Sequence, residues 1–430
     1  MRTLLKNAIL LVEKDRWETV PRGFLGINDQ RIDYLDAIPP AQSYDHEIDL
    51  ENHLILPGFF NLHAHTGMTS LRGIGSGLPL HRWLKEAMFP REAKFSSSDI
   101  QRSSQIAILE MIASGIVSFS DMYIQPWLTA ALVETSGMKA NLSVPFASKD
   151  FSRPEIDQER IDTAVKVFQE YHQSAEERIR IDFAIHAEYT SLKASAQAYS
   201  EACRSCGARM HLHLAETEAD VKGCIERHGV TPAAFFAGIG TFENPTNAAH
   251  CVVLSDADIE ILREKGVAAI HNPSSNMKLG SGFMPIRKLM DAGIPVVLGT
   301  DSTASNNNLN FLEEIHLASL IHCGAAHDPT ILSAEEVLTM ATSAGAAAQG
   351  RNDTGRLKVG NKADLAIFDL DRPHLMPVHD APALIVYAAQ ASDIVCTIVD
   401  GKMIYDHGEY LTIDAEKAKA DYRQSCARIH

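Results

Sequence analysis

The sequence has few residues of several kinds, and each shortage excludes a class of protein. It contains seven cysteines, an odd number without regular spacing, so we expect reduced thiols and no disulfide framework. No apolar run approaches the roughly 20 residues that cross a bilayer, and the sequence carries no secretory signature. These absences predict a soluble, cytoplasmic protein without a membrane partner.

Basic residues are in the minority. The chain has 39 Lys and Arg against 55 Asp and Glu, for a formal net charge of −16. Such an acidic balance disfavours polyanions, because phosphate backbones and anionic lipid surfaces are bound by basic patches. We therefore exclude nucleic acid polymers as main partners, whereas a small neutral or cationic substrate fits. Whether several copies assemble is left open.

Both ends of the chain are rich in predicted strands. Residues 8–12 and 24–27 read as strands near the start, and residues 363–368 and 394–405 near the end, the latter as a hairpin around Asp400-Gly401. The 430 residues leave room for one large domain and a smaller module. We predict a small β-sandwich module built from residues 1–57 and 355–430, flanking a domain of residues 58–354.

The middle of the chain alternates short apolar runs with helical patterns, which is typical of βα units around a parallel sheet. Capping boxes are predicted at Ser98 and at Ser333, each before an apolar helical run. Eight strand candidates can be counted: 55–61, 116–121, 140–146, 181–186, 209–214, 248–254, 267–271 and 294–299. Eight such units predict an α/β fold of the TIM (β/α)8 barrel type, with a doubly wound open sheet as the alternative.

Histidines and acidic residues follow most of these strands. His63 and His65 are two apart on a strand, so both side chains lie on one face. A His-x-His pair alone is a weak signal. The later strands end in further candidates: His186, His211, His213, Glu216, His250, His271 and Asp301. In a barrel these strand ends meet on one face, where active sites lie, so a shared site is expected.

Imidazole nitrogens with one carboxylate are typical ligands of Zn²⁺, and also of Fe²⁺. The natural set is His63, His65, Asp301 and one of His211 or His213. A bound metal lowers the pKa of its water to about 7. Glu216 would then be free to carry protons, although a carboxylate at this place also suits a helix N-terminus.

Several longer runs of sequence resemble one known family. They include residues 57–69, 213–217, 249–251, 271–280 and 299–307. Together they resemble the amidohydrolase superfamily and, within it, are most similar to the S-adenosylhomocysteine and 5′-methylthioadenosine deaminases. The resemblance covers nearly the whole chain, including the terminal module, and its Asn-Pro-Ser-Ser-Asn-Met-Lys-Leu run is specific.

The resemblance implies roles for the strand-end residues. One divalent metal ion per subunit would be bound by His63, His65, His213 and Asp301, which decides against His211. Asp301 would also accept a proton, Glu216 would deliver protons to a purine ring, and His250 would orient the attacking water. The implied reaction is hydrolytic deamination of an adenosine derivative to its inosine analogue and ammonia.

The resemblance also implies substrate contacts. Glu92, after Trp83-Leu84, would bind the ribose hydroxyls, and His186 would contact the nucleoside. Arginines bind the amino-acid carboxylate in S-adenosylhomocysteine deaminases. Here Val144 stands at one such position, and Arg160 matches the other only with a one-residue shift. A lost arginine removes a carboxylate clamp, which favours smaller derivatives such as adenosine, 5′-deoxyadenosine or 5′-methylthioadenosine.

Two other functions compete with this hypothesis. One is another reaction of the same family, such as deamination of a guanine-like or triazine ring, or halide loss. The other is a metal-free binding protein. A second metal site at Cys203 and Cys206 is disfavoured, because this pair lies in a helical stretch. Lys278 could contact a phosphate, but bracing a loop is the expected role.

Overall fold

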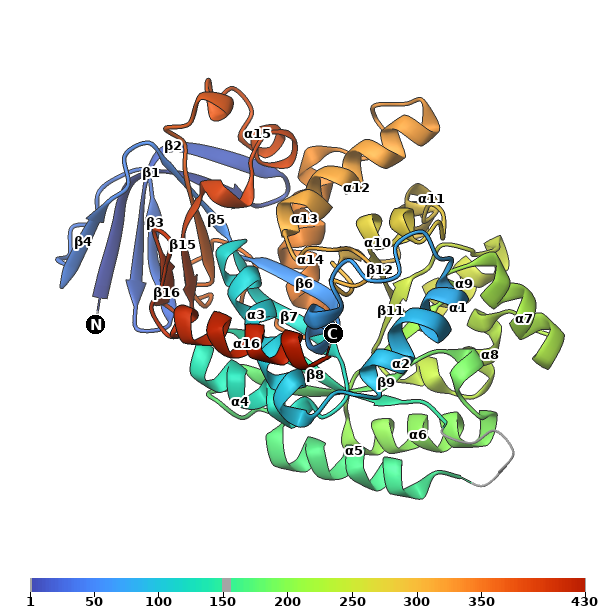
Figure 1. Ribbon diagram of the computed structural model, residues 1–430. Coiled ribbons are helices and arrows are strands. Elements are labelled where there is room, and N and C mark those ends of the chain that lie inside the picture. The colour runs from blue at the N-terminus through green and yellow to red at the C-terminus, as the bar shows by residue number, and fades with distance from the viewer. Residues whose placement is uncertain (1, 149–155, 430) are drawn as a thin grey trace.

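The computed structural model describes residues 2–148 and 156–429, which form two sheets with helices packed around them (Figure 1). One sheet has eight parallel strands in the order of the chain. They are β6 (Phe59–Ala64), β7 (Ile116–Met122), β8 (Lys139–Phe146), β9 (Ile179–Ile185), β10 (Met210–Leu214), β11 (Thr246–His250), β12 (Ala268–His271) and β13 (Val296–Leu298).

This sheet closes into a barrel just beyond β13. The backbone amide of Asp301 donates to the carbonyl of His63 at 2.9 Å, and Ala64 forms a parallel bridge with Asp301. The first and last strands are thereby joined. The TIM barrel prediction is confirmed, and the alternative of an open doubly wound sheet is wrong.

Helices cover the outside of the barrel. Apolar side chains of the strands and helices pack against each other in one large cluster. Short helices α1 (Leu80–Arg82) and α2 (Phe89–Glu92) follow β6. The others up to residue 348 are α3 (Ser97–Ala113), α4 (Pro126–Ser136), α5 (Gln158–Tyr171), α6 (Lys193–Cys206), α7 (Glu218–His228), α8 (Pro232–Gly238), α9 (Asp256–Lys265), α10 (Pro273–Lys278), α11 (Ile286–Asp291), α12 (Phe311–Ala326), α13 (Ala334–Ala341) and α14 (Ser343–Ala348).

The second sheet contains nine strands from both ends of the chain, as predicted. The N-terminal strands are β1 (Arg2–Glu13), β2 (Trp17–Asn28), β3 (Arg31–Asp36), β4 (His46–Asp49) and β5 (His53–Pro57). The C-terminal strands are β14 (Leu365–Asp369), β15 (Ile394–Val399), β16 (Lys402–Asp406) and β17 (Glu409–Tyr410). The two sets meet where β5 pairs antiparallel with β14.

The prediction of one strand over residues 55–61 is wrong, because two strands of different sheets meet there. Strand β5 ends at Pro57 and β6 begins at Phe59. Gly58 lies between them, and a Cβ atom at this position would come within 2.2 Å of Val117 Cγ1. We propose this change of sheet as the domain boundary, giving units of residues 1–57 with 355–430 and of residues 58–354.

Two other predicted boundaries need correction. The strand expected over residues 248–254 stops at His250, because His250 and Cys251 adopt φ values of 75° and 48°, outside the β region. The first capping box is formed by Ser96 and Asp99 rather than by Ser98. The box at Ser333 is confirmed.

After the last strand the chain returns to the barrel. Helix α16 (Ala415–Ile429), seen across the front of Figure 1, packs on α3, and Arg102 of α3 donates to the Ser425 hydroxyl at 3.1 Å. The remaining helix, α15 (Ala381–Tyr387), packs beside α12 and α13. Across the described residues, no helix combines the length and apolar character needed to cross a bilayer.

Candidate active site

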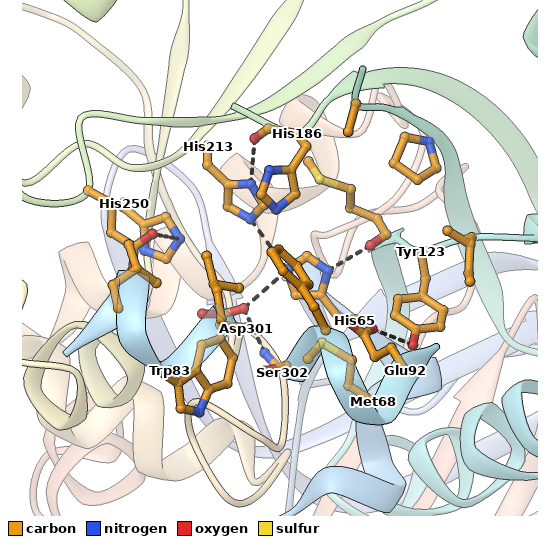
Figure 2. A pocket seen from close by; sticks show the side chains of 18 of the residues that line it. His65, Met68, Trp83, Glu92, Tyr123, His186, His213, His250, Asp301 and Ser302 are labelled. Carbon is orange, nitrogen blue, oxygen red and sulfur yellow. Dashed lines mark hydrogen bonds and ion pairs between the residues drawn. The ribbon is translucent and has the colours of Figure 1, made fainter. Parts of the chain in front are cut away.

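A pocket of about 260 Å³ opens at the carboxyl ends of the barrel strands (Figure 2). The predicted site residues meet here although they come from seven separate parts of the chain. Those that line the pocket are His65, Trp83, Glu92, Arg160, His186, His213, Glu216, His250 and Asp301. His63 lies fully buried next to them.

Five of these side chains present their metal-binding atoms to one another in two overlapping groups. Nitrogens of His63, His65 and His213 lie within 4.8 Å of each other, as do ligand atoms of His63, His250 and Asp301. Asp301 Oδ1 lies 3.2 Å from His65 Nε2 and 3.6 Å from His63 Nε2. A metal ion would separate and satisfy groups that otherwise crowd together.

The other nitrogen of each imidazole is already engaged. Nδ1 of His65 donates to the Met122 carbonyl at 2.6 Å, and Nδ1 of His213 donates to the His186 carbonyl at 2.6 Å. Nε2 is therefore the nitrogen through which each of these two rings would bind a metal. His63 Nε2 is fully buried without a hydrogen-bond partner. An orphaned imidazole nitrogen beside a carboxylate fits a divalent cation.

The structure separates the remaining histidines from this cluster. His211 lies behind His63, its Nε2 at 2.9 Å from His63 Nδ1, so it supports the ring rather than facing the pocket. His271, another strand-end candidate, faces α12 instead, where its Nε2 lies 3.0 Å from His322 Nε2. Proximity in sequence to a strand end did not suffice to place either ring in the pocket.

Asp301 is held by residues that sequence reasoning missed. Its Oδ2 accepts hydrogen bonds from the hydroxyls of Ser275 at 2.6 Å and Ser305 at 2.9 Å. Burial alone would raise the pKa of this carboxyl, but the hydrogen bond from His65 and the nearby histidine charges hold it well below its usual range. Both serines belong to the runs at residues 271–280 and 299–307, which carried the only signal for them.

Glu216 lies at the cluster beside His250. Its Oε2 lies 3.6 Å from His250 Nε2, and the ring of His250 is oriented by Asn276, whose Oδ1 lies 2.8 Å from Nδ1. Burial is the main reason that the pKa of Glu216 rises to about 7. A carboxyl poised near neutral pH can both give and take a proton.

The segment that follows β6 covers the other end of the pocket. It contains a π-helical turn over Trp83–Met88, a geometry that is rare and often functional. The Trp83 indole nitrogen is buried and has no hydrogen-bond partner. Glu92 accepts a hydrogen bond from the Tyr123 hydroxyl at 2.7 Å, and burial raises the pKa of its carboxyl.

Two further pocket residues come from the third and fourth βα units. His186 lies beside the Thr190 hydroxyl, 3.1 Å from its Nδ1, and burial lowers the pKa of the ring to about 4, so it is neutral. Arg160 lines the wall with Nε at 3.3 Å from Asp157. Val144 does not line the pocket; Pro145 and Ala147 do.

The sequence contained two weaker candidates outside this site. Cys203 and Cys206 lie in helix α6, where burial raises the pKa of both thiols, and both potential metal clusters among the described residues belong to the histidine site. Lys278 donates to the Ala304 carbonyl at 2.9 Å and to Asn307 at 2.8 Å. It braces the loop after β13.

Comparison with known proteins agrees with this geometry. Residues 54–404 match the model of the amidohydrolase family. The chain belongs to that family.

Related proteins match along nearly their full length. A 5-methylthioadenosine/S-adenosylhomocysteine deaminase from Acetivibrio thermocellus is 38% identical, with 100% of both chains covered. A 5′-deoxyadenosine deaminase from Methanosarcina mazei is 40% identical, with 99% of this chain and 98% of that protein covered. The crystal structure of an adenosine deaminase from Xanthomonas campestris with bound zinc superposes with a TM-score of 0.93 at 27% identity, covering 99% and 98% of the two chains.

Proposed function

We propose that this amidohydrolase is a metal-dependent hydrolytic deaminase of adenosine derivatives. Its substrates would be 5′-methylthioadenosine, 5′-deoxyadenosine, adenosine or S-adenosylhomocysteine, and its products the inosine analogue and ammonia. The observation that carries this proposal is one pocket with two chemical ends. A cluster of metal-ligand atoms and a carboxyl with a pKa of about 7 lie at one end, and the carboxyl of Glu92 lies at the other.

His63, His65, His213 and Asp301 would hold one divalent ion per subunit, which we propose to be Zn²⁺, with Fe²⁺ as the alternative. The three nitrogens and one carboxylate suit either ion, and the zinc-bound Xanthomonas structure has the same fold. When bound, such an ion lowers the pKa of a coordinated water and so supplies a nucleophile at neutral pH.

The chain's own residues would move the protons. Glu216, protonated below about pH 7, would donate to a ring nitrogen of the purine and so make the amino-bearing carbon more electrophilic. Asp301, held ionised, would accept a proton from the attacking water. His250, fixed by Asn276, would orient that water beside Glu216.

The nucleoside would lie with its base toward Glu216 and its ribose toward Glu92. A carboxylate suits the ribose because it can accept hydrogen bonds from both hydroxyls. Trp83 and His186 would contact the nucleoside from the two sides of the pocket. Among the described residues, Arg160 is the only Lys or Arg that lines the pocket, and Asp157 already lies beside it. This favours the smaller adenosine derivatives over S-adenosylhomocysteine.

The proposal is tested by measuring ammonia release from purified protein with adenosine, 5′-deoxyadenosine, 5′-methylthioadenosine, S-adenosylhomocysteine, adenine and guanine. We expect activity on nucleosides with a small 5′ group and little on either free base. Activity confined to the free bases would refute the role of Glu92, and elemental analysis showing neither zinc nor iron would refute the metal site.

A further inference from the structure

The segment that covers the pocket has few polar attachments to the rest of the protein. It runs from Leu80 to Glu92 and follows Gly73, Gly75 and Gly77, whose φ values of 80°, 74° and 84° suit glycine alone. The segment packs its apolar residues in a cluster with Met68 and Leu71 of the 3₁₀ helix η1 (Thr66–Leu71), with Tyr123 directly after β7, and with Ala304 of the loop after β13. Among the described residues, two polar contacts join it to other elements: Tyr123 with Glu92, and His81 with Asp220.

The second contact crosses to the opposite wall of the pocket. His81 Nε2 lies 2.9 Å from Asp220 Oδ1, and the His81 ring meets the Tyr189 ring edge-on with a centroid distance of 5.1 Å. Tyr189 lines the pocket next to His186. His81 therefore joins the segment to the fourth and fifth βα units, far from its own origin at β6.

Asp220 is in turn bonded to the residue that follows Glu216. Its Oδ2 accepts hydrogen bonds from the backbone amide and the hydroxyl of Thr217, both at 2.9 Å, which caps helix α7. Glu216 directly precedes that cap. The His81–Asp220 pair thus connects the segment bearing Trp83 and Glu92 to the segment bearing Glu216.

We propose that His81 is a positioning residue, which holds Trp83 and Glu92 over the bound nucleoside by pairing with Asp220. It acts through Glu92 and does not contact the substrate. This inference rests on the proposed nucleoside deaminase function for its kinetic test only. Without the pair, the segment would keep its apolar packing but lose its attachment to the fourth and fifth βα units. The ribose site would then be formed in only part of the molecules, which raises KM.

The test compares H81L, which removes the imidazole nitrogen beside Asp220 but retains an apolar side chain, with H81Q, whose amide N–H can reach the same carboxylate. Asp220 is left unchanged because it also caps α7. H374L is a control matched in distance and exposure, since His374 hydrogen-bonds Asp393 at 2.8 Å and the side-chain exposures, 39% and 2%, resemble the 39% and 6% of His81 and Asp220. Asp393 also caps a helical turn, remote from the pocket.

For H81L we expect KM for the best nucleoside to rise about threefold to fivefold with kcat little changed, the size set by a half-exposed ion pair. H81Q should restore KM, and H374L should not alter it. Hydrogen exchange of residues 80–92 should accelerate in H81L but not in H374L. An unchanged KM or unchanged exchange in H81L would overturn the proposal. Exchange requires no turnover, so it tests the pair even if the wild type proves inactive on every nucleoside.

Discussion

The two ends of the barrel each bury a polar cluster, and the clusters differ in how their charges are satisfied. At the amino end, Lys139 at the start of β8 pairs with Asp364, and with Asp400 at 2.6 Å. These three residues join the barrel to the nine-stranded sheet and are almost fully buried. At the carboxyl end, His63 retains an orphaned Nε2 among other imidazoles.

From this difference we propose that the amino-end cluster serves stability and the carboxyl-end cluster serves chemistry. Opposite charges that satisfy each other leave nothing for a ligand, whereas unpaired nitrogens beside a carboxylate carry a cost that a bound cation would relieve. In TIM barrels the carboxyl end bears the active site and the amino end the stabilising contacts. Both clusters here follow that division, and the following experiments test it.

Metal removal should have the largest effect. Treatment with a strong chelator should abolish deamination, because the water would lose its activation, and stoichiometric Zn²⁺ or Fe²⁺ should restore it. Circular dichroism should show that the fold persists, since the Lys139 cluster needs no metal. Full activity in protein shown by elemental analysis to be metal-free would contradict the assignment of the histidine cluster.

Replacing the proposed proton donor should come next. E216Q should lower kcat by about 10²- to 10⁴-fold, the usual contribution of a general acid, while metal content and the thermal midpoint stay near wild type. E218Q is the matched control, because Glu218 lies two residues on and is exposed. Near-normal turnover in metal-loaded E216Q would show that another group supplies the proton.

Replacing Lys139 at the amino end of the barrel should lower the stability of the protein and leave its catalytic rate unchanged. K139M should lower the free energy of unfolding by about 3–5 kcal/mol, because buried Asp364 loses its cation and Asp400 keeps only Lys362, at 3.4 Å. The kcat/KM of the folded fraction should be unchanged. K288M, which breaks the exposed pair with Asp256, should cost under about 0.5 kcal/mol. A K139M variant with normal stability but reduced kcat/KM would contradict the assignment of the Lys139 cluster to stability.

The smallest effect is a pH dependence. Burial raises the pKa of Glu216 to about 7, so its acid form persists up to that pH and is lost above it. We therefore expect kcat/KM to be level just below pH 7 and to fall about tenfold per pH unit above it. The pH profile of K139M should have the same shape as that of the wild type. The profile of E216Q should lack the fall in kcat/KM above pH 7. A profile that rises through pH 8 would contradict the role of Glu216 as acid.

Much of the site could be predicted from the sequence because its residues follow strands. Period-two alternation placed His63 and His65 on one face, and the barrel rule brought Asp301 to the same end. The sequence could not separate His211 from His213, since alternate residues of a strand share a face. Their difference depends on depth in the barrel, where His211 meets His63 rather than the pocket.

Other features lacked any local signal. The close approach of Gly58 to Val117 involves a neighbouring strand. The serines that hold Asp301 come from helix α10 and from the loop after β13. The His81–Asp220 pair joins residues 139 positions apart in the sequence. Such contacts depend on loop paths, which apolar periodicity does not encode.

The sequence by itself therefore determined the alternation of strands and helices, the strand-rich ends of the chain and the residue types available at the strand ends, because apolar periodicity and chemical identity are local properties. The tertiary structure alone decided which of those residues meet, since barrel closure brings His63 next to Asp301 across more than half the chain. It also decided their protonation, because burial and neighbouring charges, which shift a pKa, exist only after folding.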